Sequence, residues 1–258
     1  EVGDGGEFIG QVRRHGAHVR TVLADDLEGV QKKIKAAWDK QKTMSAKVAL
    51  TTHMEMGAMV IDSTGSGTME FMRQADKVYS RNELKSTATQ KMGEKDQKME
   101  QSMLSIIDGE FMHTYTEMMG QKSATKAKID PKMSGEPTAL FEELQKERDF
   151  KLLPDETIDG AKTWVVEATA REKNPMGGGR MVLNFHQDSG FVIKIAIFGE
   201  GEKPITTISY SDLKFGEKID PDHFKFKAPE GVEEIDQTSA PAPSTARSSS
   251  TRPRSRAN

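Results

Sequence analysis

The residues best suited to bind a metal gather in one ten-residue stretch, TTHMEMGAMV at positions 51–60, which holds one histidine and three methionines. Imidazole and thioether groups are soft ligands that suit Cu(I). A second stretch, FMHTYTEMM at 111–119, would add another histidine if it lay on a neighbouring strand. The candidate ligands of such a Cu(I) site are His53, Met54, Met56, Met59 and His113.

The element that carries these residues suggests a different use for them. In KVALTTHMEM, residues 47–56, apolar and polar side chains alternate, which is the pattern of a β-strand. Alternation puts Met54 and Met56 on one face and His53 on the other, whereas a copper site needs them to converge. The chain has 15 methionines, and methionine suits adaptable apolar surfaces. The stretch is therefore also explained as part of an apolar wall.

Catalytic and cofactor motifs are absent from the sequence. The chain has no cysteine, which excludes disulfides, thiolate metal sites and cysteine nucleophiles. Its six histidines are widely spread, and neither H-E-x-x-H nor G-x-S-x-G occurs. We expect no enzyme activity, and the residues call for no cofactor.

Charge and composition divide the 258 residues into three parts. Residues 1–20 are glycine-rich and lack periodicity, so we expect a flexible lead-in. Residues 21–238 form the folded domain. Residues 239–258 contain only small or polar side chains and four arginines, and should be disordered. Since the chain carries −3 and this tail +4, residues 1–238 carry −7, which argues against nucleic-acid binding.

The two ends of the chain suggest where in the cell the protein is located. A basic tail suits anionic lipid headgroups, so one role for residues 239–258 is a peripheral membrane contact. No apolar run reaches the length of a membrane span. The chain begins with Glu1 rather than methionine, and we expect a removed signal peptide.

Periodicity predicts an α+β domain that is mainly antiparallel β. Apolar residues recur every three or four positions from Leu23 to Trp38, which predicts an amphipathic helix. Five or six strands follow, then a short helix near 137–149, then five or six more strands with hairpin-length links. A single curled half-barrel sheet of about 10–11 strands, with helices covering its concave face, satisfies this order.

Three motifs in this order resemble the LolA/LolB-like lipoprotein carrier family. GTMEFMRQADKVYSRNEL at 67–84 is similar to its strand pair with an arginine, although Gln74 stands where that pattern has proline. IIDGEFMHTYTE at 106–117 looks like its Asp-Gly hairpin, and IDPDHFKFKAPEGVEEID at 219–236 resembles its closing signature. The resemblance covers roughly residues 21–237.

The resemblance implies a non-catalytic protein of the bacterial periplasm or cell envelope. It implies a bent half-barrel whose helices form a lid over an apolar cavity for lipid or lipoprotein acyl chains, carried between membranes, with an envelope protein as donor or acceptor. Arg73 matches the strand arginine that contacts the lid. Alternation selects the cavity wall, which consists of Met54, Met56, Met69, Phe71, Trp164, Val166, Leu183, Phe185, Ile193 and Ile195.

Two alternatives remain open. In the first, the chain is a structural or sensory envelope domain that has the fold but no cargo, since fold does not determine function. In the second, it is a Met/His-rich periplasmic protein that binds Cu(I). A cavity filled by its own side chains would favour the first alternative.

Overall fold

The computed structural model describes residues 25–93, 95–129, 136–172 and 179–238, so the predicted segments 1–20 and 239–258 lie outside the described residues. Its helices are α1 (Asp25–Trp38), α2 (Pro137–Leu144) and the short 3-10 helix η2 (Pro221–Phe224). Its strands are β1 (Thr43–Met56), β2 (Met59–Gln74), β3 (Lys77–Met92), β4 (Lys95–Asp108), β5 (Phe111–Met118), β6 (Gln121–Lys128), β7 (Arg148–Ile158), β8 (Ala161–Ala170), β9 (Arg180–His186), β10 (Val192–Phe198), β11 (Pro204–Phe215) and β12 (Glu234–Asp236).

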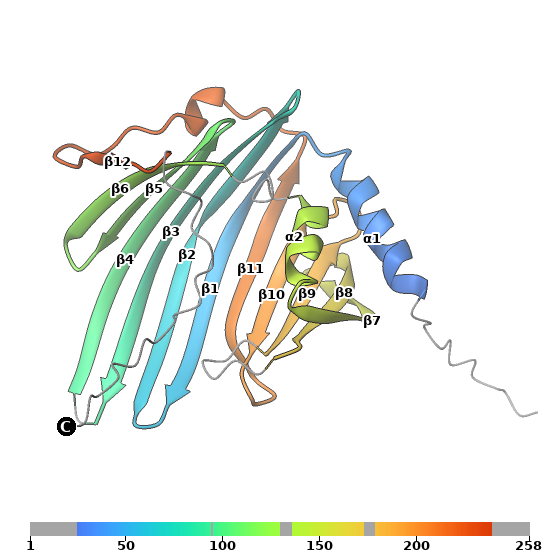
Figure 1. Ribbon diagram of the computed structural model, residues 1–258, viewed down its shortest axis with the longest axis horizontal. Coiled ribbons are helices and arrows are strands. Elements are labelled where there is room, and N and C mark those ends of the chain that lie inside the picture. Colours follow the sequence, from blue (N-terminus) through green and yellow to red (C-terminus); the bar gives the residue numbers. More distant parts are fainter. Residues whose placement is uncertain (1–24, 94, 130–135, 173–178, 239–258) are drawn as a thin grey trace, which may run out of the picture.

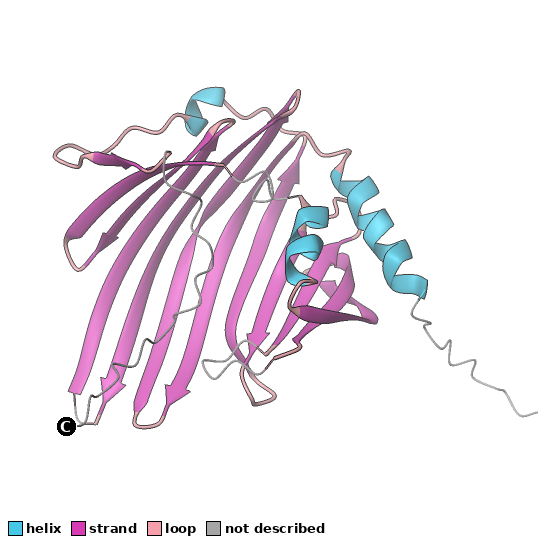
Figure 2. Ribbon diagram, viewed as in Figure 1, coloured by secondary structure: helices cyan, strands magenta, loops and turns pink. Residues whose placement is uncertain are grey.

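All twelve strands belong to one sheet, in the order β12-β6-β5-β4-β3-β2-β1-β11-β10-β9-β8-β7 (Figures 1 and 2). Every neighbouring pair is antiparallel except β12 and β6. The sheet is open, because its outer strands β12 and β7 do not pair with each other. The predicted α+β class with a mainly antiparallel sheet is confirmed. The twelfth strand is the three-residue β12, which is too short to be read from the sequence.

The long hairpins extend beyond the motifs that the sequence offered. β2 begins at Met59, before the motif at 67–84, and β4 begins at Lys95, before the motif at 106–117. The register explains the extension, because Met59 pairs with Met92 and Met92 with Lys95. Strand ends that are held by ladder hydrogen bonds to a neighbour need no regular apolar alternation of their own.

The two α-helices lie on one face of the sheet over β7–β11, and we call this the helix-side face (Figure 1). Val30 and Ile34 of α1 and Phe141 of α2 are buried against Leu183 and Phe185 of β9. The four-residue spacing of Val30, Ile34 and Trp38 gives α1 one buried stripe, as the sequence predicted. We refer to β7–β11 as the covered half of the sheet and to β1–β6 as the open half.

The β9–β10 turn holds α1 in place. Gly190 has a φ of 69°, a conformation that favours glycine. A Cβ atom there would lie 2.2 Å from the carbonyl oxygen of Ile34 and 2.8 Å from the amide nitrogen of Trp38. Helix and turn can approach this closely only because residue 190 has no side chain.

The C-terminal segment packs on the opposite face of the open half. Phe224 of η2 is buried with Met72 and Ile106 in a separate cluster. Asp220 caps η2 by accepting a hydrogen bond from the backbone N–H of Asp222 at 3.0 Å. The open half is therefore covered at one end on this face, while on the helix-side face no described helix lies over β3–β6 (Figure 1).

Candidate functional site

All ten residues predicted to form a cavity wall lie on the helix-side face. The register aligns Met54 with Ile61 and Phe71 with Met44 in the open half, and Val166 with Leu183 in the covered half. Eight of the ten belong to the two clusters beneath the helices or pack against them, namely Met69, Phe71, Trp164, Val166, Leu183, Phe185, Ile193 and Ile195. Met54 and Met56 lie beyond these clusters.

Side chains of the protein itself fill the space beneath the helices. The Phe141 ring of α2 stacks on Phe185 with centroids 5.2 Å apart. Trp38 of α1 meets Phe71 at 4.8 Å and Phe191 at 6.2 Å. Two cavities, described below, lie elsewhere, and none of the ten residues lines either of them. The wall residues of the covered half thus act as core in this structure.

Arg73 lies at the boundary between the two halves. Its guanidinium is 5.4 Å from the centroid of the Trp38 ring, at the end of α1, and 5.8 Å from that of Phe71. It also lines a cavity of about 530 Å³ together with Lys35 of α1, Glu136 before α2 and Ile107 of β4. The arginine singled out by the resemblance therefore touches a helix through an aromatic ring, next to a cavity where the helical cover ends.

The helix-side face of the open half is rich in methionine. The register places these apolar residues on one surface, which we call the methionine face: Val48, Leu50, Met54, Met56, Met59, Ile61, Leu84, Ala88, Met99, Met103, Met112 and Met118. Most are half-buried, and Met56 and Met118 are 40% and 47% exposed. No described helix packs on this surface as α1 and α2 pack on the covered half (Figure 1).

Sequence reasoning assigned only two members of the methionine face, Met54 and Met56, to the cavity wall, and it named Met59 as a candidate copper ligand. The other members alternate with hydroxyl and charged residues in strands whose polar composition hides them, as in MEQSMLSII at 99–107. Two signals pointed to them: the 15 methionines of the chain, and the four-residue spacing of Met99, Met103 and Ile107. Only the hairpin register shows that they meet the other strands on one face.

Glycine allows two strands of the methionine face to come close together. Gly67 pairs with Val48 on one side and Leu84 on the other. A Cβ atom at Gly67 would lie 1.8 Å from the carbonyl oxygen of Glu83. Since no side chain fits there, β2 and β3 can approach only with glycine at this position.

The five candidate copper ligands do not converge. His53 lies on the face opposite to Met54, as alternation predicted, with its Nδ1 2.6 Å from Asp62 and its Nε2 3.1 Å from Glu55. The hydrogen bond with Asp62, followed by that with Glu55, raises the pKa of His53 above 6.5. His113 lies on β5, which is three strands from β2 and four strands from β1 in the sheet. Within the described ranges, no three His, Asp or Glu side chains are grouped to hold a metal.

His113 instead links the C-terminal segment to the sheet. It is buried, with Nδ1 2.7 Å from a carboxylate oxygen of Glu234 and Nε2 3.1 Å from one of Asp108. Its ring stacks on Phe226 at 5.1 Å. Asp108 also accepts the backbone N–H groups of Glu110 and Phe111. Burial opposes the ionised form of Asp108, but these hydrogen bonds and His113 together lower its pKa below 3.8.

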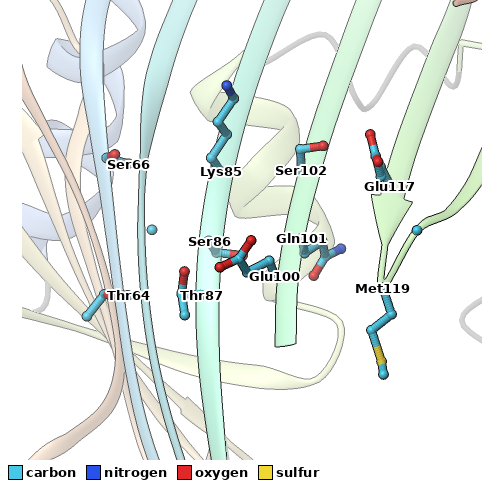
Figure 3. Close-up of a pocket in the computed structure, with 12 residues that line it drawn as sticks. Thr64, Ser66, Lys85, Ser86, Thr87, Glu100, Gln101, Ser102, Glu117 and Met119 are labelled. Carbon is cyan, nitrogen blue, oxygen red and sulfur yellow. The ribbon is translucent and has the colours of Figure 1, made fainter. Parts of the chain in front are cut away.

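The opposite face of the open half carries a polar trough of about 790 Å³. Figure 3 shows it from the side away from the helices, with Ser66, Lys85, Thr87 and Glu117 along it. Its lining is mainly hydroxyl, amide and charged groups, with Met119 as its large apolar side chain, so it offers an acyl chain little apolar contact to offset dehydration. The two faces of the open half therefore suit different ligands, and only the methionine face suits hydrocarbon.

Comparisons with known proteins assign no function to any residue of this chain. No family model matches the chain. An uncharacterized protein of Methanocaldococcus jannaschii is 23% identical over 208 residues, which span 79% of this chain and 52% of the relative. The chain thus spans about half the length of the curated relative that it matches.

The solved structures similar to the chain are distant. The Pseudomonas aeruginosa MucA/MucB complex has a TM-score of 0.45 and 14% identity, covering 78% of this chain and 61% of that chain. A Vibrio parahaemolyticus domain named for outer membrane lipoprotein sorting has a TM-score of 0.32 and 11% identity, covering 77% and 94%. The name of the second neighbour matches the family that the sequence motifs resemble. At these identities and TM-scores, no ligand or residue role passes to this chain.

Proposed function

We propose that this chain is a non-catalytic bacterial envelope protein that binds lipid or lipoprotein acyl chains on its methionine face and carries them between membranes. The observation that carries the proposal is the methionine face itself, a half-buried apolar surface without a described helix over it. The register also places Gln90, Gln97 and Gln101 on this face, but the row Val48, Gly67, Leu84 and Met103 crosses four strands without a polar side chain. Apolar surface larger than scattered single residues marks an interaction site. The envelope location rests on the sequence motifs.

The composition of this face suits hydrocarbon of variable shape. Burying each methylene of an acyl chain contributes about 0.8 kcal/mol, so a long chain can bind without a polar contact. Methionine side chains are unbranched and polarizable, and they repack around different partners. The methionine face therefore favours flexible chains over one rigid ligand.

The cavity beside Arg73 adds a polar end to this site. It lies where α1 and α2 meet the open half, and its lining combines the apolar Val78 and Ile107 with the charged Lys35 and Glu136. In the proposed mechanism the helices act as the lid, acyl chains partition onto the methionine face, and a membrane or an envelope protein removes them. Movement of the lid requires that Trp38 separate from Arg73.

One observation favours a second function, a structural or sensory domain without cargo. The space beneath the helices is occupied by Trp38, Phe71, Phe141 and Phe185. A carrier that used only this region would have no room for an acyl chain. The two functions differ in whether the methionine face binds lipid.

Binding of a fluorescent long-chain fatty acid to the purified protein, followed by native mass spectrometry, tests the proposal. Leu84→Asp places a charge on the methionine face and should weaken binding at least tenfold. Thr87→Asp, on the same strand but the opposite face, is the matched control and should bind normally. Equal binding by both variants would contradict the assignment of the face. No binding by the unaltered protein would favour the domain without cargo.

A further inference from the structure

The turn between β5 and β6 exposes two apolar side chains at one point. Met118 is 47% exposed and Met119 is 61% exposed. Among the described residues, the only other large hydrophobic side chains classed as exposed are Met56 and Ile235. Figure 3 shows the Met119 side chain extending past the end of β5. We call Met118 and Met119 the methionine tip.

The backbone of this turn disfavours the residue that occupies it. Met119 has a φ of 52° and Gly120 a φ of 80°, and positive φ at both central positions is the requirement of a type I′ turn. Asn-Gly is the preferred sequence for such a turn, and a left-handed conformation is unfavourable for methionine. Met119 thus weakens the hairpin and also exposes apolar surface. Strained residues of this kind cluster at functional sites.

The methionine tip continues the methionine face. Met118 pairs with Gln101 of β4, which makes Met99 and Met103 its diagonal neighbours on the same face. Met118 therefore extends the methionine face to the end of the β5–β6 hairpin, whereas Met119 lines the polar trough on the opposite face.

We propose that the methionine tip inserts into the surface of a lipid bilayer. Two unbranched, flexible side chains at a hairpin end can enter the boundary between headgroups and acyl chains without a shaped pocket. So small an apolar area gives weak and reversible attachment. The attachment holds whether or not the methionine face binds lipid. A role of the methionine tip as the place where acyl chains enter the methionine face rests on the proposed function above.

Cosedimentation of the full chain with vesicles of phosphatidylcholine and a minority of phosphatidylglycerol tests this proposal. The double variant Met118→Ser with Met119→Ser should partition at least tenfold more weakly. Ile235→Ser is the matched control, because Ile235 is 56% exposed but lies on β12 opposite Thr125, away from the turn. It should partition like the unaltered protein.

Met119→Asn separates attachment from folding. Asparagine relieves the backbone conflict, so this variant should melt at a higher temperature and yet bind vesicles several-fold more weakly. Vesicle binding that is unchanged in both tip variants, or weakened equally by Ile235→Ser, would overturn the proposal. Fatty-acid binding without vesicles should stay normal in Met119→Asn, because Met119 is not part of the methionine face. Loss of fatty-acid binding in Leu84→Asp, with vesicle binding retained, therefore reports on the proposed function rather than on the tip.

Discussion

The covered and open halves of the sheet bury their helix-side faces in different ways. Beneath α1 and α2, Val166, Leu183 and Phe185 have no exposed area, and the Phe141 ring of α2 stacks on Phe185. In the open half, Leu84 and Met103 stay half-exposed. The same strand alternation thus produces a closed core in one half and an accessible apolar surface in the other.

The two halves use different apolar residues for different purposes. Branched and aromatic side chains such as Val166 and Phe185 have defined shapes and specify one packing arrangement. Methionines such as Met99 and Met103 tolerate several arrangements. Stability should therefore depend mainly on the covered half, while ligand binding should depend on the open half.

Truncating the covered core should cause the greatest loss of stability. Phe185→Ala should lower the free energy of unfolding by about 3–5 kcal/mol, because it leaves a cavity beneath Phe141. Met103→Ala, on the methionine face, should cost about 1 kcal/mol or less, since its side chain is already partly in water. Urea denaturation of both variants measures the contrast, and equal losses would remove the distinction between the halves.

The contact between α1 and the covered half is the next target. Gly190→Ala should destabilise the protein by roughly 2–4 kcal/mol, because a methyl group would meet the Ile34 carbonyl in a left-handed turn. Gly57 also has a positive φ, of 61°, but a Cβ atom there would have no other atom within 4 Å. Gly57→Ala should therefore cost only about 1–2 kcal/mol. Thermal denaturation measures both losses. Equal decreases in melting temperature would show that the close approach of Gly190 to α1 does not hold the helix in place.

A smaller effect is expected where the C-terminal segment joins the open half. Glu234→Gln weakens the contact with His113 and should cost about 1–2 kcal/mol. Hydrogen exchange should then rise in the edge strand β12 and in its neighbour β6, while α1 stays protected. The neighbouring Glu233→Gln is the control, because that side chain is exposed. Faster exchange in α1 as well would mean that the two halves unfold as one unit.

The weakest effects should come from two histidine titrations of opposite sign. Burial lowers the pKa of His186, in the covered half, below 6.5, and Asp188 opposes that shift. The unfolded chain then binds the proton more readily, so this contribution to stability falls as pH drops from about 6.5 through the folded pKa. Asp62 raises the pKa of His53, so its contribution is full at low pH and is lost as pH rises through the folded pKa. NMR titration should place the two midpoints on opposite sides of 6.5. Coincident midpoints would contradict the burial effect on His186 and the carboxylate contact of His53.

Local pattern was sufficient for much of the fold. The spacing of Val30, Ile34 and Trp38 predicted α1 and its buried side, because a helix repeats every 3.6 residues. Alternation around Met54 placed the predicted wall residues on one face and His53 on the other, because strand side chains alternate in direction. These periodicities belong to single elements and need no knowledge of their partners.

Sequence pattern alone was thus enough to predict the elements, their apolar sides and the antiparallel class of the sheet. Which apolar sides are filled and which stay accessible depended on tertiary contacts. Phe71 and Met54 look equivalent in sequence, yet Trp38 covers the first and no described helix covers the second. That outcome depends on where α1 docks and on the register that joins Met103 to Leu84. Both are contacts between residues distant in the chain, which no local period encodes.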